Sequence, residues 1–437
     1  MHLGLFFIGT GHHVSGWRHP ATPVDGDVNI DYHIDVARKA EQAGFDFLFI
    51  ADSSAMRGAN DVEALSRTSR AIALEPLTTL GALAVATSRL GFIATITTSY
   101  NEPYNLARQL ASLDHISKGR IGWNVVTSNN EAEALNFSRT SHYSHSDRYA
   151  RAREFIEVAR GLWDSFDDDA FVGDKEEGRF FRPDGLHRLD HKGEHFAVAG
   201  PLTLPRPPQG HPVIVQAGSS ETGRDLAAQS ADVVFTAQQT VEGARAFYAD
   251  LKGRMAAYGR KPETLKIMPG FAPIVGRTQE EAEARFREVQ SYVLPEVGLS
   301  TLQNTLGGAD LSAYPLDGPV PELPVTNGPR SRQQLILENA RRRGITLREL
   351  CLEVVVARGH FSIVGTPERI ADEMQLWVET GAADGFNVMP QVMPTGLDDF
   401  IELVIPELRR RGLFRDGYAG TTLRDNLGLA RPAPRRP

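Results

Sequence analysis

Residues 90–128, LGFIATITTSYNEPYNLARQLASLDHISKGRIGWNVVTS, contain the pattern on which the fold prediction rests. Two runs rich in apolar and β-branched residues, 90–98 and 121–127, are typical of buried strands. Between them Pro103 stands where a helix can start, because the N–H that proline lacks would be unpaired there. The segment therefore predicts a strand–helix–strand unit, whose two strands are expected to be parallel.

The same alternation continues along the chain. Eight apolar runs are predicted to be strands, at residues 3–8, 45–50, 90–98, 121–127, 213–217, 233–236, 265–275 and 385–389. Helices are predicted at residues 31–43, 75–86, 103–116 and 147–166. Eight strands that alternate with helices favour an α/β fold, a closed TIM (β/α)8 barrel that forms a single domain over residues 1–437.

A doubly wound open sheet is the alternative for this alternation. It would need a glycine-rich turn after the first strand. Gly9 and Gly11 stand there, but the next glycine is Gly16, so the dinucleotide-binding pattern fails. The barrel is therefore the favoured architecture.

Three polar stretches do not fit the repeat and are expected to be insertions around the barrel mouth: residues 129–146, 167–210 and 299–343. The third is expected to have little regular structure up to residue 332 and then to form a basic helix over residues 333–343. It is expected to be either a mobile lid over the mouth or a disordered or oligomer-packing insertion. The Pro/Arg-rich tail, residues 430–437, is expected to be frayed.

Composition limits the function classes. The chain has 437 residues, of which 41% are hydrophobic and 23% are charged, as in ordinary globular proteins. A net charge of −8 gives no electrostatic footprint for nucleic acid. Cys351 is the single cysteine, which excludes an intrachain disulfide and a cysteine-ligated zinc site. We find neither a secretory leader nor an apolar run of roughly 20 residues, so a cytoplasmic protein without a membrane span is expected.

Polar residues gather where the predicted strands end, which is the end at which barrel enzymes place their active sites. They are Asp52, Ser53, Thr97, Thr98, Asn124, Thr127 and Ser128. A turn cap or an ordinary strand threonine explains any single one of them equally well. Because all of them fall at one end of one barrel, together they favour a functional site.

Residues 216–224, QAGSSETGR, join a predicted strand to a helix. Small residues and hydroxyls at a helix start leave backbone N–H groups free beside the positive end of the helix dipole. Ser219 and Ser220 are therefore predicted to cradle a phosphate. The alternative is that one of them is simply the N-cap of the helix.

His145 and Tyr149 lie four residues apart at the start of the predicted helix 147–166, so both can face one ligand. A solvated helix end is the equally acceptable interpretation. His12 and His13 follow the first strand and either line a substrate pocket or support the loop.

Three further histidines, His187, His191 and His195, have the spacing of one helix face. Gly193 interrupts that run and its flanks resemble a hairpin, so no metal site is predicted. The sequence shows neither a nucleophile elbow nor a Gly-Lys-Ser/Thr phosphate loop. The residues alone thus indicate a barrel enzyme with an anion-binding site.

The sequence resembles the nitrilotriacetate monooxygenase component A group of the bacterial-luciferase superfamily. That group includes EDTA monooxygenase, long-chain alkane monooxygenase, dibenzothiophene-sulfone monooxygenase and a pristinamycin synthase. The matching blocks are residues 17–20, 45–53, 75–98, 102–108, 119–128, 145–166, 200–236, 365–390 and 406–429. They follow one another in order along nearly the whole chain, and the least matched region is 299–343.

The resemblance implies a luciferase-like TIM barrel that binds reduced FMN, supplied by a separate NAD(P)H-dependent flavin reductase. It implies oxygenation of a small organic substrate through a C4a-(hydro)peroxyflavin, and a homo-oligomer, either a dimer or a tetramer. The family's flavin contacts correspond to Asp52, Thr98, His145, Tyr149 and Ser219 or Ser220, with Ser128 as a further contact. His12 or His13 corresponds to a pocket histidine of the alkane enzyme, although the spacing to Trp17 is one residue shorter here.

Two other activities remain compatible with the same barrel. One is a deazaflavin-dependent dehydrogenase, which transfers hydride without oxygen. The other is a flavin-binding protein without turnover. The substrate is left open among organosulfur compounds, aminopolycarboxylates, alkanes and similar small molecules, because specificity lies in the inserted loops.

Overall fold

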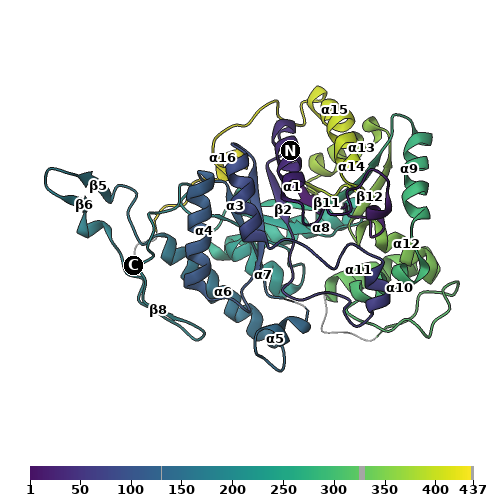
Figure 1. The fold of residues 1–437 in the computed structure, drawn as a ribbon, viewed down its shortest axis with the longest axis horizontal. Helices are drawn as coiled ribbons and strands as arrows, with labels where there is room; N and C mark the ends of the chain where they lie inside the picture. The colour runs from purple at the N-terminus through teal and green to yellow at the C-terminus, as the bar shows by residue number, and fades with distance from the viewer. Residues whose placement is uncertain (129, 324–329, 435–437) are drawn as a thin grey trace.

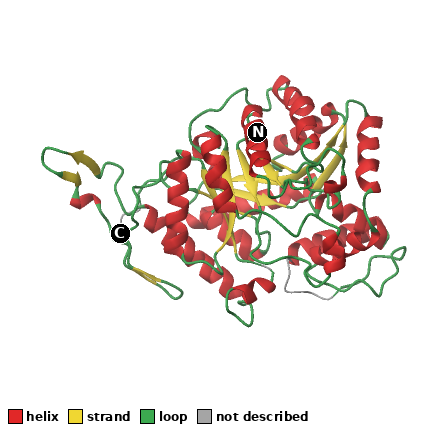
Figure 2. Cartoon of the chain, viewed as in Figure 1, coloured by secondary structure: helices red, strands yellow, loops and turns green. Residues whose placement is uncertain are grey.

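The structure is a computed structural model that describes residues 1–128, 130–323 and 330–434. Parallel strands form a closed ring that helices surround (Figures 1 and 2). The ring consists, in chain order, of β1 (His2–Phe7), β2 (Phe47–Ile50), β3 (Gly91–Thr97), β4 (Ile121–Val126), β9 (Val213–Gln216), β10 (Val233–Thr236), β11 (Lys266–Val275) and β13 (Gly385–Val388). Pairing of β10 with β11, of β11 with β13 and of β13 with β1 closes the ring. The predicted barrel and its eight predicted strands are confirmed.

The eight predicted strands do not include one strand of the main sheet. β12 (Phe361–Gly365) runs parallel to the second half of β11, with Phe271 opposite Phe361 and Val275 opposite Gly365. β11 is ten residues long, and β10 pairs only with its first half. The unpaired backbone groups of the second half therefore need another partner, and β12 supplies it.

The outer layer consists mainly of the helices that connect the strands. They include α1 (Ile30–Ala43), α3 (Pro76–Ala86), α4 (Pro103–Ser117), α6 (His145–Trp163), α7 (Glu221–Ser230), α8 (Val241–Arg254), α9 (Gln279–Ser291), α13 (Pro367–Glu379) and α15 (Ile405–Arg410). α1 shows why the boundaries fall where they do: Asn29 caps its first turn and Gly44 ends it in the left-handed region. No helix in the described part of the chain is long and apolar enough to cross a membrane.

Alternation along the strands creates two apolar layers. Phe47 and Ile93 belong to the cluster inside the barrel, whereas their neighbours Leu48 and Phe92 belong to the cluster beneath the helices. Successive side chains of a strand point to opposite faces, so a strand such as β3 contributes to both layers. The polar exceptions on the inner face, discussed below, lie toward the carboxyl ends.

The first and third insertions lie at the barrel mouth, as expected, since residues of both line the cavity there. The first contains α5 (Ala132–Asn136). In the third, the predicted basic helix is confirmed as α11 (Arg330–Arg343), but the expectation of irregular chain from residue 299 is wrong, because α10 (Pro295–Thr305) extends into it. α10 packs against α12 (Leu347–Ala357) through buried leucines. This packing explains why the third insertion begins as a helix. Residues 324–329 of the expected lid lie outside the described residues, and closure remains a prediction.

The second insertion, residues 167–210, does not lie at the mouth, so that expectation is wrong. It connects the end of α6 to the beginning of β9, which places it at the amino ends of the strands. It forms two small hairpins, β5 (Phe171–Asp174) with β6 (Arg179–Phe181) and β7 (His191–Lys192) with β8 (Ala197–Val198), and these project from the body of the molecule (Figure 1). His187 and His191 lie here against the carboxylates of Asp167 and Glu154, at 3.0 and 2.9 Å.

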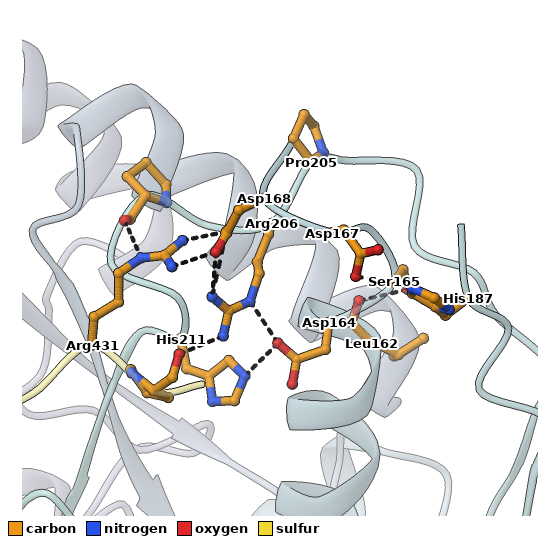
Figure 3. Close-up of polar contacts among 12 residues, drawn as sticks. Leu162, Asp164, Ser165, Asp167, Asp168, His187, Pro205, Arg206, His211 and Arg431 are labelled. Atoms are coloured by element: carbon orange, nitrogen blue, oxygen red, sulfur yellow. Dashed lines mark hydrogen bonds and ion pairs between the residues drawn. The ribbon is translucent and has the colours of Figure 1, made fainter. Parts of the chain in front are cut away.

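A buried ion-pair cluster fastens this insertion to the barrel (Figure 3). The Arg206 side chain, 1% exposed, donates to Asp164 at 2.8 Å, and the His211 ring also bonds Asp164, at 2.9 Å. Arg206 also donates to the carbonyl of Pro432, while Arg431 pairs with Asp168. The expectation of a frayed tail is therefore wrong for residues 431 and 432, which this cluster holds in place.

We predict that Arg206→Ala lowers the free energy of unfolding by about 3–5 kcal/mol, because it leaves the Asp164 carboxylate buried without its main cationic partner. Arg431→Ala is the matched control: its ion pair with Asp168 is 42% and 46% exposed, so it should cost at most about 1 kcal/mol. Urea titrations of the two variants measure the difference. Equal losses of stability in the two variants would contradict the inference that the buried Arg206–Asp164 pair contributes most of the cluster's stabilisation.

Candidate active site

A cavity of about 1080 Å³ opens at the carboxyl ends of the strands. Inside the barrel its floor includes the rings of Phe6, Phe49 and Phe235, whose centroids lie 5.0 to 5.5 Å apart. Its walls come from the loops after β2 and β4, the starts of α6 and α7, and α10. Small-molecule sites commonly measure about 300–1,000 Å³, so this cavity has room for a cofactor and a substrate together.

The structure brings most of the predicted site residues to this cavity. Those that line it are His12, Asp52, Ser128, His145, Tyr149, Ser219 and Ser220. Thr98 does not line it: its hydroxyl donates to the carbonyl of Val126 at 3.3 Å. The neighbouring Thr97 lines the cavity instead, because consecutive strand residues face opposite sides of the sheet.

Glu133, which the sequence analysis missed, joins the loops of the mouth. Its carboxylate, 3% exposed, accepts from the Ser53 hydroxyl at 3.1 Å and lies 2.7 Å from the Ser128 hydroxyl. Ser128 in turn lies 2.7 Å from the Thr97 hydroxyl. One buried carboxylate thus connects the ends of β2, β3 and β4. No local motif marks it, since it lies within a polar insertion.

Arg148 supports the same loop from α6. Its guanidinium donates to the carbonyl of Ser128 and, at 3.1 Å, to Nε2 of His142. Nε2 of this imidazole also lies 3.4 Å from the carbonyl of Ser128, and Nδ1 faces the hydroxyl of Tyr100. Desolvation lowers the pKa of His142. These contacts hold Ser128 at φ +57°, a left-handed conformation that costs energy for a residue with a side chain.

His12 lines the cavity with both ring nitrogens engaged. Nε2 donates to the carbonyl of Phe6 at 2.8 Å, and Nδ1 accepts from Arg358 at 2.8 Å. Burial, reinforced by the charge of Arg358, lowers its pKa well below the usual value. His12 is therefore neutral and fixed in one tautomer, which suits a wall of the pocket better than a proton-transfer group.

His13 lies beside the cavity rather than in its lining. Its Nδ1 accepts from the backbone N–H of Ser15 at 3.2 Å, and Nε2 faces the side-chain oxygen of Gln290 at 3.4 Å. Burial lowers its pKa to about 4. Arg70, also missed from the sequence, donates to the carbonyls of Gly11 and His12 and so holds this loop closed over the barrel.

The loop before α7 has the features of an anion site. Ser220 is the N-cap of the helix and accepts from the N–H of Gly223 at 3.1 Å, so the capping interpretation holds for this residue. Ser219 precedes the helix and lines the cavity. A Cβ on Gly218 would lie 3.1 Å from the Cα of Gly223 and 3.4 Å from the Tyr149 hydroxyl. Glycine at this position therefore avoids a close contact between the loop, α7 and Tyr149.

Charge is distributed unevenly around the mouth. Asp52 lies at the end of β2, where desolvation raises the pKa of its carboxyl group. Arg57, Arg70 and Arg358 also line the cavity and supply positive charge. A smaller cavity of about 530 Å³ adjoins Ser219 on the side of α8 and is lined in part by Arg224. The site can therefore bind anionic groups at more than one place.

We predict that His13 makes the protein less stable in acid. Its folded pKa is depressed, so between pH 6.5 and about 4 the unfolded chain binds more protons than the folded one. Stability is then fully present above pH 6.5 and falls as the pH drops, by at most about 1.4 kcal/mol per pH unit for one group. His13→Gln should flatten this dependence in urea titrations between pH 4 and 7. His19→Gln, at a half-buried position, is the control.

The comparisons with known proteins agree with this geometry. The chain matches the luciferase-like monooxygenase family over residues 6–384. It is 51% identical over 435 residues to N-acetyl-S-(2-succino)cysteine monooxygenase of Bacillus subtilis (strain 168), covering 99% of this chain and 97% of that protein. It is 51% identical over 439 residues to nitrilotriacetate monooxygenase component A of Aminobacter aminovorans, with the same coverage.

Among solved structures, a riboflavin lyase crystallised with modified FMN and riboflavin superposes with a TM-score of 0.87 at 32% identity, over 98% of this chain and 96% of that one. The shared barrel, the cavity at the carboxyl ends of its strands and the sequence matches along nearly the whole chain lead to one conclusion. The chain belongs to the luciferase-like monooxygenase family and is a flavin-dependent monooxygenase.

Proposed function

We propose that this chain is the oxygenase component of a two-component monooxygenase that uses reduced FMN as a co-substrate. The observation that carries the proposal is a single cavity that combines an anion-binding loop at the start of α7 with an enclosed aromatic floor. A relative at 51% identity is named component A, which fits a system whose flavin comes from a separate NAD(P)H-dependent reductase. We propose that reduced FMN reaches the cavity by diffusion or during a transient contact, and that the enzyme is a homo-oligomer.

The residues of the cavity fit FMN. Ser219, Ser220 and the N–H groups at the start of α7 suit the phosphate, and Tyr149 and His145 stand beside them. Asp52, Ser128 and Thr97 lie farther along the mouth, where they suit the flavin ring. When bound, reduced FMN supplies two electrons to O2, so that one oxygen atom enters the substrate and the other leaves as water.

The protein's part is to orient both ligands and to exclude water. Glu133 and Arg148 fix the loops against which the ligands lie, and Phe6, Phe49 and Phe235 close the barrel beneath them. A dry, preformed site protects a reactive oxygen species from hydrolysis. Desolvation raises the pKa of Asp52, so this carboxyl group at the cavity wall keeps its proton to a higher pH than a solvated aspartate does.

We further propose a small substrate that carries carboxylates. The two relatives at 51% identity are named for an S-substituted cysteine and for nitrilotriacetate, both of which are polycarboxylates. The guanidinium groups of Arg57, Arg70 and Arg358 lie in the cavity lining and supply the complementary charge. An aliphatic alkane offers no negative charge to these cations, so the carboxylated classes of organosulfur compounds and aminopolycarboxylates are favoured.

We predict that Ser219→Ala weakens FMN binding by about 1–3 kcal/mol, the usual effect of losing a hydrogen bond to a charged group. Riboflavin, which lacks the phosphate, should bind both proteins equally. Ser220→Ala should in addition lower the stability of the protein by about 1 kcal/mol, because this residue caps α7. Titration calorimetry with both flavins measures these effects. Equal losses for FMN and riboflavin would contradict a phosphate site at Ser219.

We predict substrate oxidation when the protein is supplied with FMN, NADPH, O2 and a generic flavin reductase. Carboxylated thioethers and aminopolycarboxylates should couple oxygen use to product, whereas alkanes should yield hydrogen peroxide. Oxygen electrode readings and mass spectrometry of the products measure the coupling. Hydride transfer to a deazaflavin in the absence of O2 would support the dehydrogenase alternative. Tight flavin binding without turnover of any substrate would support the storage alternative.

A further inference from the structure

Two polar side chains face each other on the inner surface of the barrel. Thr95 of β3 and Asn124 of β4 are register partners, and Nδ2 of Asn124 donates to Oγ1 of Thr95 at 2.9 Å. Both residues line the cavity, although their exposures are only 5% and 3%. They are surrounded by apolar neighbours such as Ile93, so their polarity needs an explanation.

The pair is incompletely satisfied. Oδ1 of Asn124 is buried and has no hydrogen-bond partner among the described residues. Leaving such an acceptor unsatisfied is unfavourable, so buried amides are normally fully bonded. The Thr95 hydroxyl accepts from Asn124 and keeps its own proton to donate. Together the two side chains place one acceptor and one donor side by side in the wall of the cavity.

The surroundings restrict what this pair can bind. Phe6, Phe49 and Phe235 provide flat apolar surface, and His12 has both ring nitrogens in use. A carboxylate would place negative charge against the amide oxygen of Asn124, which is unfavourable. The matching partner is a planar ring with an N–H beside a carbonyl, which is the pattern of an imide edge.

We propose that Thr95 and Asn124 bind the imide edge of the flavin ring, with Asn124 accepting from the N3–H group and Thr95 donating to a carbonyl beside it. This inference rests on the proposed function, because it takes FMN as the ligand of the cavity. It assigns a role to two residues that neither the resemblance nor the anion-binding loop indicated. The anion-binding loop before α7 then binds the phosphate of FMN, and the Thr95–Asn124 pair binds the imide edge of its ring.

The test compares FMN with 3-methyl-FMN, in which the N3 proton is replaced by a methyl group. Dissociation constants are measured by flavin fluorescence for the wild-type protein, Asn124→Leu, Thr95→Val and Thr95→Ser. We expect the wild type to bind FMN at least about tenfold more tightly than 3-methyl-FMN, and Asn124→Leu and Thr95→Val to weaken FMN binding about 5- to 30-fold. Thr95→Ser retains the hydroxyl and should bind FMN like the wild type.

The decisive quantity is the ratio of the two dissociation constants. In Asn124→Leu this ratio should approach one, because the N3 proton has lost its acceptor. A wild-type ratio near one overturns the inference, and so does a ratio that is unchanged in Asn124→Leu, which would indicate a purely steric effect of the methyl group. If Asn124→Leu fails to fold, Asn124→Ala, which also lacks the acceptor, takes its place in the comparison of ratios. Failure of FMN itself to bind the wild type would instead remove the proposed function.

Discussion

The constraint on which this structure depends is that every strand of a closed barrel must pair on both sides. Closing the ring through β10–β11, β11–β13 and β1–β13 satisfies that requirement without leaving an edge in the barrel. Closure also brings the carboxyl ends of all eight strands to one rim. Residues as distant in sequence as Asp52, Ser128 and Ser219 therefore meet around one cavity.

Within that rim, a small number of buried charges fix loops that would otherwise be mobile. Glu133 connects the ends of three strands, and Arg148 holds Ser128 in a conformation that it would not adopt alone. The nearby histidines are neutral because burial lowers their pKa values. The rim is thus rigid, and a bound cofactor rather than a charged side chain is suited to carry the reactive chemistry.

The sequence predicted the barrel because apolar runs reveal buried strands directly. β12 was missed because it is short and pairs only with the second half of β11, outside the eight-stranded ring. Thr97 and Thr98 were both expected at the rim, and only Thr97 lines the cavity, because sequence position alone does not set which face of a strand a residue occupies. Asn124 was among the polar residues expected at the strand ends, but Glu133 and Thr95 could not be found from local patterns, since their importance comes from contacts with other segments.

The position of the two hairpins in residues 167–210 has a consequence for assembly. They project from the amino end of the barrel and carry exposed aromatic rings, including Phe180 at 71%. A second protein seated on them would lie behind the barrel, away from the rim through which ligands enter. Association through this face would leave the entrance of every protomer open to solvent, so that quaternary contacts and ligand exchange would not compete for the same surface.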